Sequence, residues 1–405
     1  IKAGAAAAAA AVSGIATASM AVGMNFEEQM STVQAISMSS GEEMEALCEE
    51  AKALGRATKF SAAEVGQGFE YMAMAGWKTE DMLAGIDGVL SLAAASGEDL
   101  GAVSDIVTDA MTAFGMGADE VNRFADVLAV AASSSNTNVS MMGETFKYVA
   151  PLAGALKYSA EDTALAIGLM ANSGIKASQA GTALRSMLSR LTKPTKEVRE
   201  AMQMLDLSLT DENGDMKTLL QLQKDIREGF KGMDPSRASE AASKLAGQEA
   251  MSGLLAIVNA TEEDFDSLTE AINNSAGAAE KMAGIRIDNL KGDLTILRSA
   301  AEGFGIEMYE GMSGLAREAV QYATGFLGEL TESASKKLPT ARREIIQFSQ
   351  GISELAGPVI TLGKWLADNP GAIVGPIAGI GTAVTAYKAA SGVASLAGAI
   401  TKMTG

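Results

Sequence analysis

The fold of this chain is set by the stretch "AGWKTEDMLAGIDGVLSLAAASG", residues 75–97, whose pattern recurs further along the sequence. The stretch begins with a glycine-bearing turn, passes through an acidic helix start into an apolar helix, and ends at a small polar break. Its apolar side chains share one helical stripe, which consists of Met82, Leu83, Ile86, Val89, Leu90 and Ala93. The pattern predicts an amphipathic helix that buries this stripe.

Two later segments repeat the pattern: "FGMGADEVNRFADVLAVAASSSN" (114–136) and "AGALKYSAEDTALAIGLMANSG" (153–174). The three units share glycines 39 residues apart, at Gly76, Gly115 and Gly154. In the third unit, Ser159 and Asp162 fit a capping box at a helix start. Repeats of this length indicate helical hairpins that stack and bury a continuous core. The three glycines are predicted helix-packing positions.

Residues 172–195, "NSGIKASQAGTALRSMLSRLTKPT", extend the series by one more hairpin. Gly174 is predicted to end a helix, and the small residues 177–183 are predicted to let two backbones approach closely. The buried stripe that follows consists of Leu184, Met187, Leu188 and Leu191. Arg185 and Arg190 lie on the other side of this helix, and a second interpretation is that the two arginines form an anion site.

The composition predicts a helical protein without a catalytic centre. The 405-residue chain has no histidine, one cysteine (Cys48), 7 prolines and 5 % aromatic residues. The missing histidine excludes the His-based nucleophile pairs and zinc sites, and one cysteine forms neither an internal disulfide nor a Cys-only metal cage. The 43 glycines indicate short helices with frequent breaks. We therefore predict an all-α fold of stacked short helical hairpins that is not an enzyme and has no cofactor or metal.

Two short motifs suggest chemistry, but each lacks residues that the chemistry needs. Ser-x-x-Lys occurs at 173–176 and 333–336, and a Ser–Lys pair can act as a nucleophile without histidine; the companion signatures of that chemistry are missing. "DENGDM" (211–216) resembles the start of a calcium loop, but Met216 and Leu222 occupy positions that need Gly and Glu. The Asn-Gly pair instead predicts a single small β-hairpin near 207–219.

Charge is distributed unevenly along the chain. The net charge is −18, no acid precedes Glu27 or follows Asp368, and the two ends carry only Lys2, Lys388 and Lys402. Removing these three positive charges leaves −21 on residues 27–368. A body with this charge repels phosphates, so we predict no specific nucleic-acid binding.

The two ends are apolar. Residues 3–24 carry no charge and are long enough to cross a bilayer, although alanine is only weakly apolar and a tightly packed helix outside a membrane fits equally well. Between 371 and 400, Gly371, Gly375 and Gly379 have GxxxG spacing, and Lys388 is the single charge. Small residues at this spacing favour close helix packing in lipid and in a protein bundle alike. Membrane insertion and packing inside a particle therefore both remain open.

Five segments are expected along the chain, which begins at Ile1 and is interpreted as a piece of a longer or processed protein. They are an apolar Ala-rich helix (1–25), a helical-hairpin repeat core (26–193), a helical region with the small β-hairpin (194–300), glycine-punctuated amphipathic helices (301–368) and apolar, potentially membrane-inserting helices (369–405).

Several segments, taken in order, resemble the core region of phage tail tape measure proteins. They are "FEEQMSTVQAIS" (26–37), "ALGRATKFSAAEVGQGFEYMAMAGW" (53–77), "VLSLAAASGEDL" (89–100), "AFGMGADEVNRFADVLAVAA" (113–132), "GIKASQAGTALRSMLSRLTKP" (174–194), the "DENGDMKTLLQL" turn and "LAGQEA" (245–250). The resemblance covers roughly residues 26–300, and no single motif in it suffices alone.

This resemblance implies a virion structural protein in the lumen and tip of the tail tube. Such a protein supports tail assembly, sets tail length, and leaves ahead of the DNA at infection. The implied partners are further copies of the chain as a homotrimer, the tail tube protein, tail-tip or baseplate hub proteins, assembly chaperones and the host membrane. The implied locations are the virion tail, the host cytoplasm during assembly, and the host membrane after ejection.

The chain departs from the family plan because it lacks a long coiled-coil ruler and any lytic domain. The segment is therefore assigned to the folded portion near the tip or the membrane. The alternative function is a pore-forming or bacteriocin-like membrane-active protein, which also combines apolar helices with an absence of catalytic residues. The two functions differ in that a toxin acts alone, whereas a tape measure protein purifies with tails.

Overall fold

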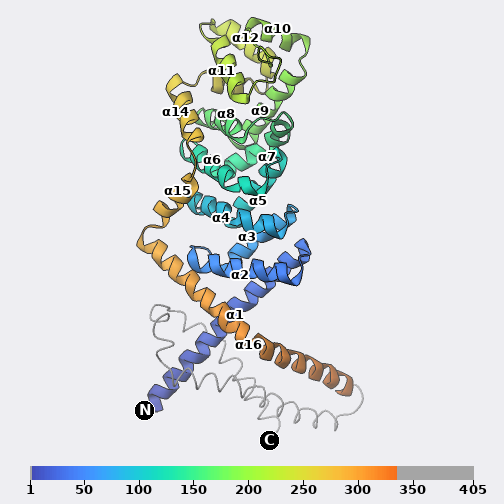
Figure 1. Cartoon of the computed structure of the whole chain (residues 1–405), viewed down its shortest axis with the longest axis vertical. Coiled ribbons are helices and arrows are strands. Elements are labelled where there is room, and N and C mark those ends of the chain that lie inside the picture. The colour runs from blue at the N-terminus through green and yellow to red at the C-terminus, as the bar shows by residue number, and fades with distance from the viewer. Residues whose placement is uncertain (1, 335–405) are drawn as a thin grey trace. The chain divides into compact units, whose positions relative to one another are not determined.

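The computed structural model describes residues 2–334, in which sixteen α-helices and one short 3-10 helix, η1 (Ala118–Glu120), account for the regular structure. The predicted all-α fold is confirmed. The described chain forms two units. One contains residues 30–54 and 58–296, and the other contains residues 2–29, 55–57 and 297–334. Figure 1 labels most of the helices of both units.

The larger unit is built from two parallel rows of helices, as Figure 1 shows. Successive members of the first row pack on one another in the order α3 (Ala62–Met74), α5 (Leu100–Phe114), α7 (Val139–Ala155) and α9 (Ala177–Thr192). The second row is α4 (Thr79–Ser96), α6 (Val121–Ser133), α8 (Ala160–Asn172) and α13 (Met251–Val258). From α3 to α9 successive helices alternate between the two rows, and α13 joins the second row after the chain has passed through α10, α11 and α12.

Two helices return along the second row. After α13 the chain continues through α14 (Glu262–Asn273), which packs on α8 and α6, and α15 (Ala278–Ile287), which packs on α6 and α4. Figure 1 shows both helices beside this row. Helices α4, α6 and α8 of the second row are therefore covered by helices that lie far from them in sequence.

The far end of the stack is covered by three short helices: α10 (Lys196–Met204), α11 (Leu219–Phe230) and α12 (Pro235–Ala246). α12 packs on α9, α10 and α13, and α11 packs on α13 and α8. At the other end, α2 (Gly41–Ala57) buries Met44 and Leu47. Covering both ends satisfies the requirement that terminal repeats shield the core from water.

Local sequence explains where these helices begin and end. Ser40 and Ser61 form complete capping boxes with the glutamates three residues later, which satisfies backbone N–H groups at the starts of α2 and α3. α4 and α5 end at glycines in the left-handed conformation, Gly97 at φ +73° and Gly115 at φ +70°. Such residues close a helix without the strain that a Cβ atom adds.

The core between the two rows combines a few large aromatic side chains with many alanines. The ring of Phe146 on α7 makes edge contacts with Phe124 on α6 and Phe114 on α5, each at 5.8 Å between centroids. Phe124 and Phe146 are at most 1 % exposed, so each contributes about 1.5–3 kcal/mol through burial. Alanines fill the remaining space, which keeps neighbouring helices close together.

In the smaller unit, α1 (Lys2–Ser37) meets α16 (Leu290–Ala334). Gly23 on α1 gives room for the ring of Tyr309, because a Cβ there would overlap it. The Tyr309 hydroxyl donates to the carboxylate of Glu27, which also pairs with Arg317, and the bond to Glu27 raises the pKa of the tyrosine. Arg56 adds an ion pair to Glu307 at 2.9 Å.

The predicted β-hairpin near 207–219 is wrong as a pair of strands. Residues 2–334 contain no strand, and this segment has a single antiparallel bridge between Thr210 and Met216. The carboxylate of Asp211 accepts from the backbone N–H groups of Asn213 and Asp215, each at 2.9 Å. The turn is therefore held by a side chain, and a hairpin this short gains too little from cross-strand pairs to extend.

Two further expectations concern the ends of the chain. Residues 301–334, expected as glycine-punctuated helices, lie in the single helix α16. Within the described range, which includes the alanine-rich segment 3–24, no helix combines the length and hydropathy of a membrane span. The segment 369–405, with Gly371, Gly375 and Gly379, and the part of 301–368 after residue 334 lie outside the described residues.

Candidate interaction sites

The three glycines of the repeat occupy two kinds of position. Gly76 and Gly115 end helices with φ of +84° and +70°, and each faces open space. Gly154 lies inside α7, where an added Cβ would overlap the carbonyl oxygen of Ala113 on α5. The expectation of a turn at Gly154 is wrong because α7 runs one residue further, and Lys157 supplies the positive φ of +58° instead.

Further glycines allow close contact along the first row. A Cβ at Gly143 on α7 would overlap Ile106 on α5, and one at Gly181 on α9 would lie 2.7 Å from the carbonyl oxygen of Thr145. The predicted close approach at residues 177–183 is thus confirmed at Gly181. The close contact at Gly143 was not predicted, because the sequence around it lacks the run of small residues found at 177–183.

Several charged side chains form hydrogen bonds to the ends of helices that lie elsewhere in the sequence. We call these residues the helix-end clamps. They comprise two aspartates and three arginines: Asp126, Asp162, Arg190, Arg227 and Arg286. Each bonds to free backbone groups at a helix end that belongs to another part of the chain. A helix leaves four N–H groups unpaired at its start and four carbonyls at its end, so these contacts complete the hydrogen bonding.

Asp126 on α6 clamps the start of α15. Its carboxylate accepts from the backbone N–H groups of Gly277 at 2.7 Å and Ala279 at 2.8 Å. The aspartate is 8 % exposed, and its charge also complements the positive end of the helix dipole. A residue 151 positions earlier in the chain thus performs the role of a helix cap.

Asp162 on α8 performs the same role for α11. Its carboxylate accepts from the backbone N–H of Leu220 at 2.9 Å, while Ser159 accepts from the N–H of Asp162 at 3.0 Å. The predicted cap at Ser159 is confirmed, but the Asp162 carboxylate is directed to α11. Burial raises the pKa of Asp162, and the hydrogen bond from Leu220 opposes this effect.

The arginine clamps bind carbonyls at helix ends. Arg286 on α15 donates to Ala95 O at 3.0 Å and Ser96 O at 2.7 Å, the last residues of α4. Gly97 leaves space for this guanidinium, because a Cβ there would overlap it. Arg227 on α11 donates to Ile257 O at the end of α13 at 2.7 Å. Positive charge at a helix C-terminus is favourable, so these contacts stabilise both partners.

The second interpretation of Arg185 and Arg190, an anion site, is not supported by their placement. Arg190 donates to Lys244 O at 3.0 Å and Leu245 O at 3.3 Å, so its guanidinium is directed to the end of α12. Arg185 is exposed on another side of α9. The two guanidinium groups therefore do not act together on a bound anion.

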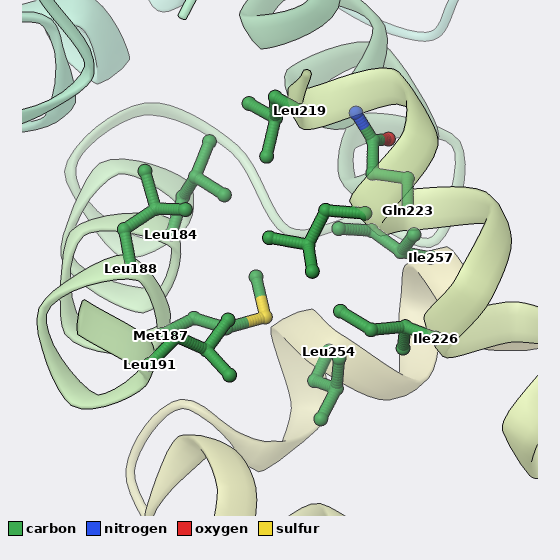
Figure 2. Close-up of a pocket in the computed structure, with 10 residues that line it drawn as sticks. Leu184, Met187, Leu188, Leu191, Leu219, Gln223, Ile226, Leu254 and Ile257 are labelled. Carbon is green, nitrogen blue, oxygen red and sulfur yellow. The ribbon is translucent and has the colours of Figure 1, made fainter. Parts of the chain in front are cut away.

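A small apolar cavity lies where α9, α11 and α13 meet, as Figure 2 shows. It has a volume of about 10 Å³, which is space for one water molecule at most. Gln223 is its polar lining residue; the amide nitrogen donates to Asp162 O at 3.0 Å, and the amide oxygen is buried without a hydrogen-bond partner. The cavity is too small for an organic ligand, so we assign it to core packing.

A shallow groove runs between α5 and α7, with a volume of about 260 Å³. Ile106 and Phe146 line its apolar part, and Asp109 and Lys147 line its edge. Partial burial raises the pKa of Asp109, and the nearby charge of Asp105 raises it further. Lys147 lies 3.3 Å from Asp105, which neutralises part of this charge.

No group of three or more acidic or cysteine side chains that could hold a metal ion occurs within residues 2–334. The calcium-loop resemblance at 211–216 is accounted for by the turn that Asp211 holds. The features that the structure brings together in this part of the chain are contacts between helices.

Comparison with known proteins identifies the family. The family model described as "Phage-related minor tail protein" matches residues 48–247, which extend from α2 to the end of α12. The chain is 37 % identical over 349 residues to the "Tape measure protein" of Pneumococcus phage Dp-1, covering 86 % of this chain and 30 % of that protein. No solved structure matches.

Two less similar relatives are also described as probable tape measure proteins. The "Probable tape measure protein" of Escherichia phage P2 is 27 % identical over 313 residues, covering 76 % of this chain and 38 % of that protein. The corresponding protein of Clostridium phage phiCD119 is 21 % identical over 354 residues, covering 86 % of this chain and 37 % of that protein.

These matches and the all-α stack define a component of phage tails. The chain belongs to the phage minor tail and tape measure protein family. It spans about a third of the length of the curated relatives that it matches.

Proposed function

We propose that this chain is the folded portion of a tape measure protein that lies in the lumen and tip of a phage tail tube. There it supports tail assembly and length determination, and it leaves at infection to help DNA cross the host envelope. The observation that carries this proposal is the 37 % identity to a tape measure protein over 86 % of the chain. That match extends well beyond the stack of hairpins.

The charge of the chain supports a position along the path of the DNA. Residues 27–368 carry a net charge of −21, so this part of the chain repels DNA phosphates. A protein that shares a narrow lumen with DNA benefits from this repulsion, because the DNA then slides past without binding. The same charge argues against specific nucleic-acid recognition.

The proposed partners are further copies of the chain as a homotrimer, the tail tube protein, tail-tip or baseplate hub proteins, and tail assembly chaperones. The helix-end clamps and glycine contacts are used inside the chain, so partners bind elsewhere. Exposed apolar side chains such as Met74 (64 % exposed) and Met141 (39 % exposed) offer surface for them. Assembly takes place in the host cytoplasm.

The proposal is tested in the phage that encodes the chain. Deletion of residues 26–296 is expected to leave particles without tails or with tails of abnormal length in electron micrographs. The matched control is the variant Gly284→Ala, whose added Cβ meets nothing within 4 Å and which we expect to leave tails normal. Mass spectrometry of purified tails should find the chain, protected from protease until ejection is triggered.

A chain that is secreted alone and missing from purified tails would contradict the proposal. That result would favour the pore-forming or bacteriocin-like alternative. The two outcomes are separated by where the protein is found, so neither requires an activity assay.

The membrane part of the proposal has its own test. The two charge-poor ends, 1–26 and 369–405, suit a protein that packs against protein first and meets the host membrane after ejection. We expect the full chain to float with vesicles of phosphatidylethanolamine and phosphatidylglycerol, and a variant that ends at residue 368 to float less. If neither floats, membrane insertion is excluded and the role in the tail is unaffected.

A further inference from the structure

The groove between α5 and α7 is hollow because small residues line it. The two helices are neighbours in the first row of the stack, as Figure 1 shows. Ala110, Ala113 and Gly143 line the groove, and none of them has a side chain larger than a methyl group. Its volume of about 260 Å³ lies below the range of about 300–1,000 Å³ that is usual for small-molecule pockets. The groove therefore suits a single inserted side chain better than a whole organic ligand.

The inner part of the groove is apolar, and its edge is open to solvent. Ile106 and Phe146 line the inner part and are themselves held in the core, at 7 % and 1 % exposure. Asp109, Lys147 and Pro151 also line the groove and are exposed. An aliphatic chain placed in the groove would remove its apolar surface from water, which is favourable.

Pro151 provides a hydrogen-bond acceptor at the side of the groove. This proline lies inside α7 and has no backbone N–H group. The carbonyl of Lys147, four residues earlier, therefore lacks the donor that an α-helix normally gives it. Both residues line the groove. A partner that carries N–H groups would supply the missing donor.

The edge of the groove has an excess of negative charge. Partial burial disfavours the charged form of Lys147, but hydrogen bonding to Asp105 and the charges of Asp109 and Glu144 raise its pKa. Three carboxylates against one ammonium group leave a net charge of −2 at this edge. Partial burial and the charge of Asp105 also raise the pKa of Asp109, so its carboxylate is not fully compensated within the chain. A positive charge from outside the chain would stabilise it.

These features together select a side chain with an aliphatic stem and a cationic head that has several N–H donors. Arginine has all of them: its stem packs on apolar surface, and its guanidinium has five donors in a fixed fork. One guanidinium can serve both the carboxylate of Asp109 and the carbonyl of Lys147. A neutral side chain leaves both acceptors unpaired, and a phosphate or carboxylate is repelled.

We propose that the groove between α5 and α7 is a docking site for an arginine side chain that a partner protein presents. The stem of the arginine lies against Ile106 and Phe146, and its guanidinium pairs with Asp109. Met141 and Tyr148 are exposed on the same helix and add contact area for the partner. Arginine, tyrosine and methionine are enriched at protein interfaces. The inference goes beyond the proposed function, which names partners but does not place them on the molecule.

The charge requirement is tested by calorimetric titration of the full chain with the peptide acetyl-Gly-Ala-Arg-Ala-Gly-amide. We expect saturable binding with a dissociation constant on the order of 1 mM. The same peptide with norleucine or glutamate in place of arginine should bind at least about fivefold more weakly. Asp109→Asn should weaken binding of the arginine peptide about fivefold. The matched control is Asp87→Asn, the same change at an exposed site on α4, which should leave binding unchanged.

The shape requirement is tested by filling the groove without changing its charge. Ala113→Leu places a larger side chain in the groove and should abolish binding of the arginine peptide. Ala84→Leu is the matched control, because Ala84 is exposed on α4 and does not line the groove. Thermal melts of both leucine variants establish that they are folded. Asp109→Asn changes an exposed residue and tests the proposal even if Ala113→Leu fails to fold.

Several results would overturn the proposal. They are an arginine peptide that does not bind at millimolar concentrations, equal binding of the arginine and glutamate peptides, an unchanged affinity in Asp109→Asn, and an equal effect of the two leucine variants. A fluorescent DNA duplex serves as the opposite probe and should not bind. Duplex binding that Ala113→Leu abolishes would assign the groove to a nucleic acid instead.

The failure of this inference differs from that of the proposed function, because the titrations use the purified chain alone. If the arginine peptide fails to bind while deletion of residues 26–296 abolishes tails, the docking site is wrong and the tail function stands. If the peptide binds as expected and the chain is missing from purified tails, the docking site stands and the tail function is wrong.

Discussion

The first row of the stack and the return helices are attached by different means. Contacts between α5, α7 and α9 are made through glycines and apolar side chains, with Gly143, Gly154 and Gly181 at the closest points. Helix α15 is held to the second row by two charged clamps, Asp126 at its start and Arg286 near its end.

The difference follows from distance along the chain. Only one helix of the second row separates α5 from α7 and α7 from α9 along the chain, so the connections already bring them near one another and shape sets their contact. The partners of α15 lie 151 to 191 residues away, where no turn fixes the approach. Directional hydrogen bonds to helix ends define that position more strictly than apolar contact does.

The largest effect is expected where two backbones touch. Gly154→Ala should destabilise the stack by about 3 kcal/mol, because its Cβ would overlap Ala113 O on the neighbouring helix and the helices must move apart. Gly284→Ala is the matched control: it lies in α15 with nothing within 4 Å and should stabilise the chain by about 0.5–1 kcal/mol. Urea unfolding measures both, and effects of equal sign would contradict the packing argument.

The sequence predicted the rows better than the return helices. The stripes at 82–93 and 184–191 and the cap at Ser159 follow from local patterns, and the structure confirms them except at Leu83, which is only partly buried. The clamps of Asp126 and Arg286 leave no such pattern, because each partner is a backbone group of any residue type. The turn at Lys157 was missed since a positive φ normally indicates glycine.

The second-largest effect is expected where α15 contacts the second row. Asp126→Ala should destabilise the chain by about 2 kcal/mol, because the N–H groups of Gly277 and of the buried Ala279 lose their acceptor. Hydrogen exchange is expected to speed up first in α15. Asp87→Asn, an exposed change on α4, is the control. Uniform loss of protection in all helices would show that the clamp acts on the stack as a whole.

The arginine clamp should give a smaller change. Arg286→Ala removes two hydrogen bonds to the end of α4 and is expected to cost about 1–2 kcal/mol. Arg286→Lys should recover part of this loss through its charge, since an ammonium still complements the helix C-terminus. Arg185→Ala, at an exposed site, should change the melting temperature little. An equal loss for Arg185 would remove the distinction between the two arginines.

The smallest effect concerns Asp109 in the α5–α7 groove, where burial raises the pKa of the carboxyl above its ordinary value of 3.8. The folded state then binds this proton more tightly than the unfolded state, so ionisation of Asp109 lowers stability as pH rises through the folded pKa. Asp109→Asn should therefore raise the melting temperature slightly at pH 7, and the gain should shrink as pH falls toward 4. A gain that stays constant with pH would instead indicate a change in packing. The α5–α7 groove would then be stabilised by apolar contacts alone, like the other contacts of the first row.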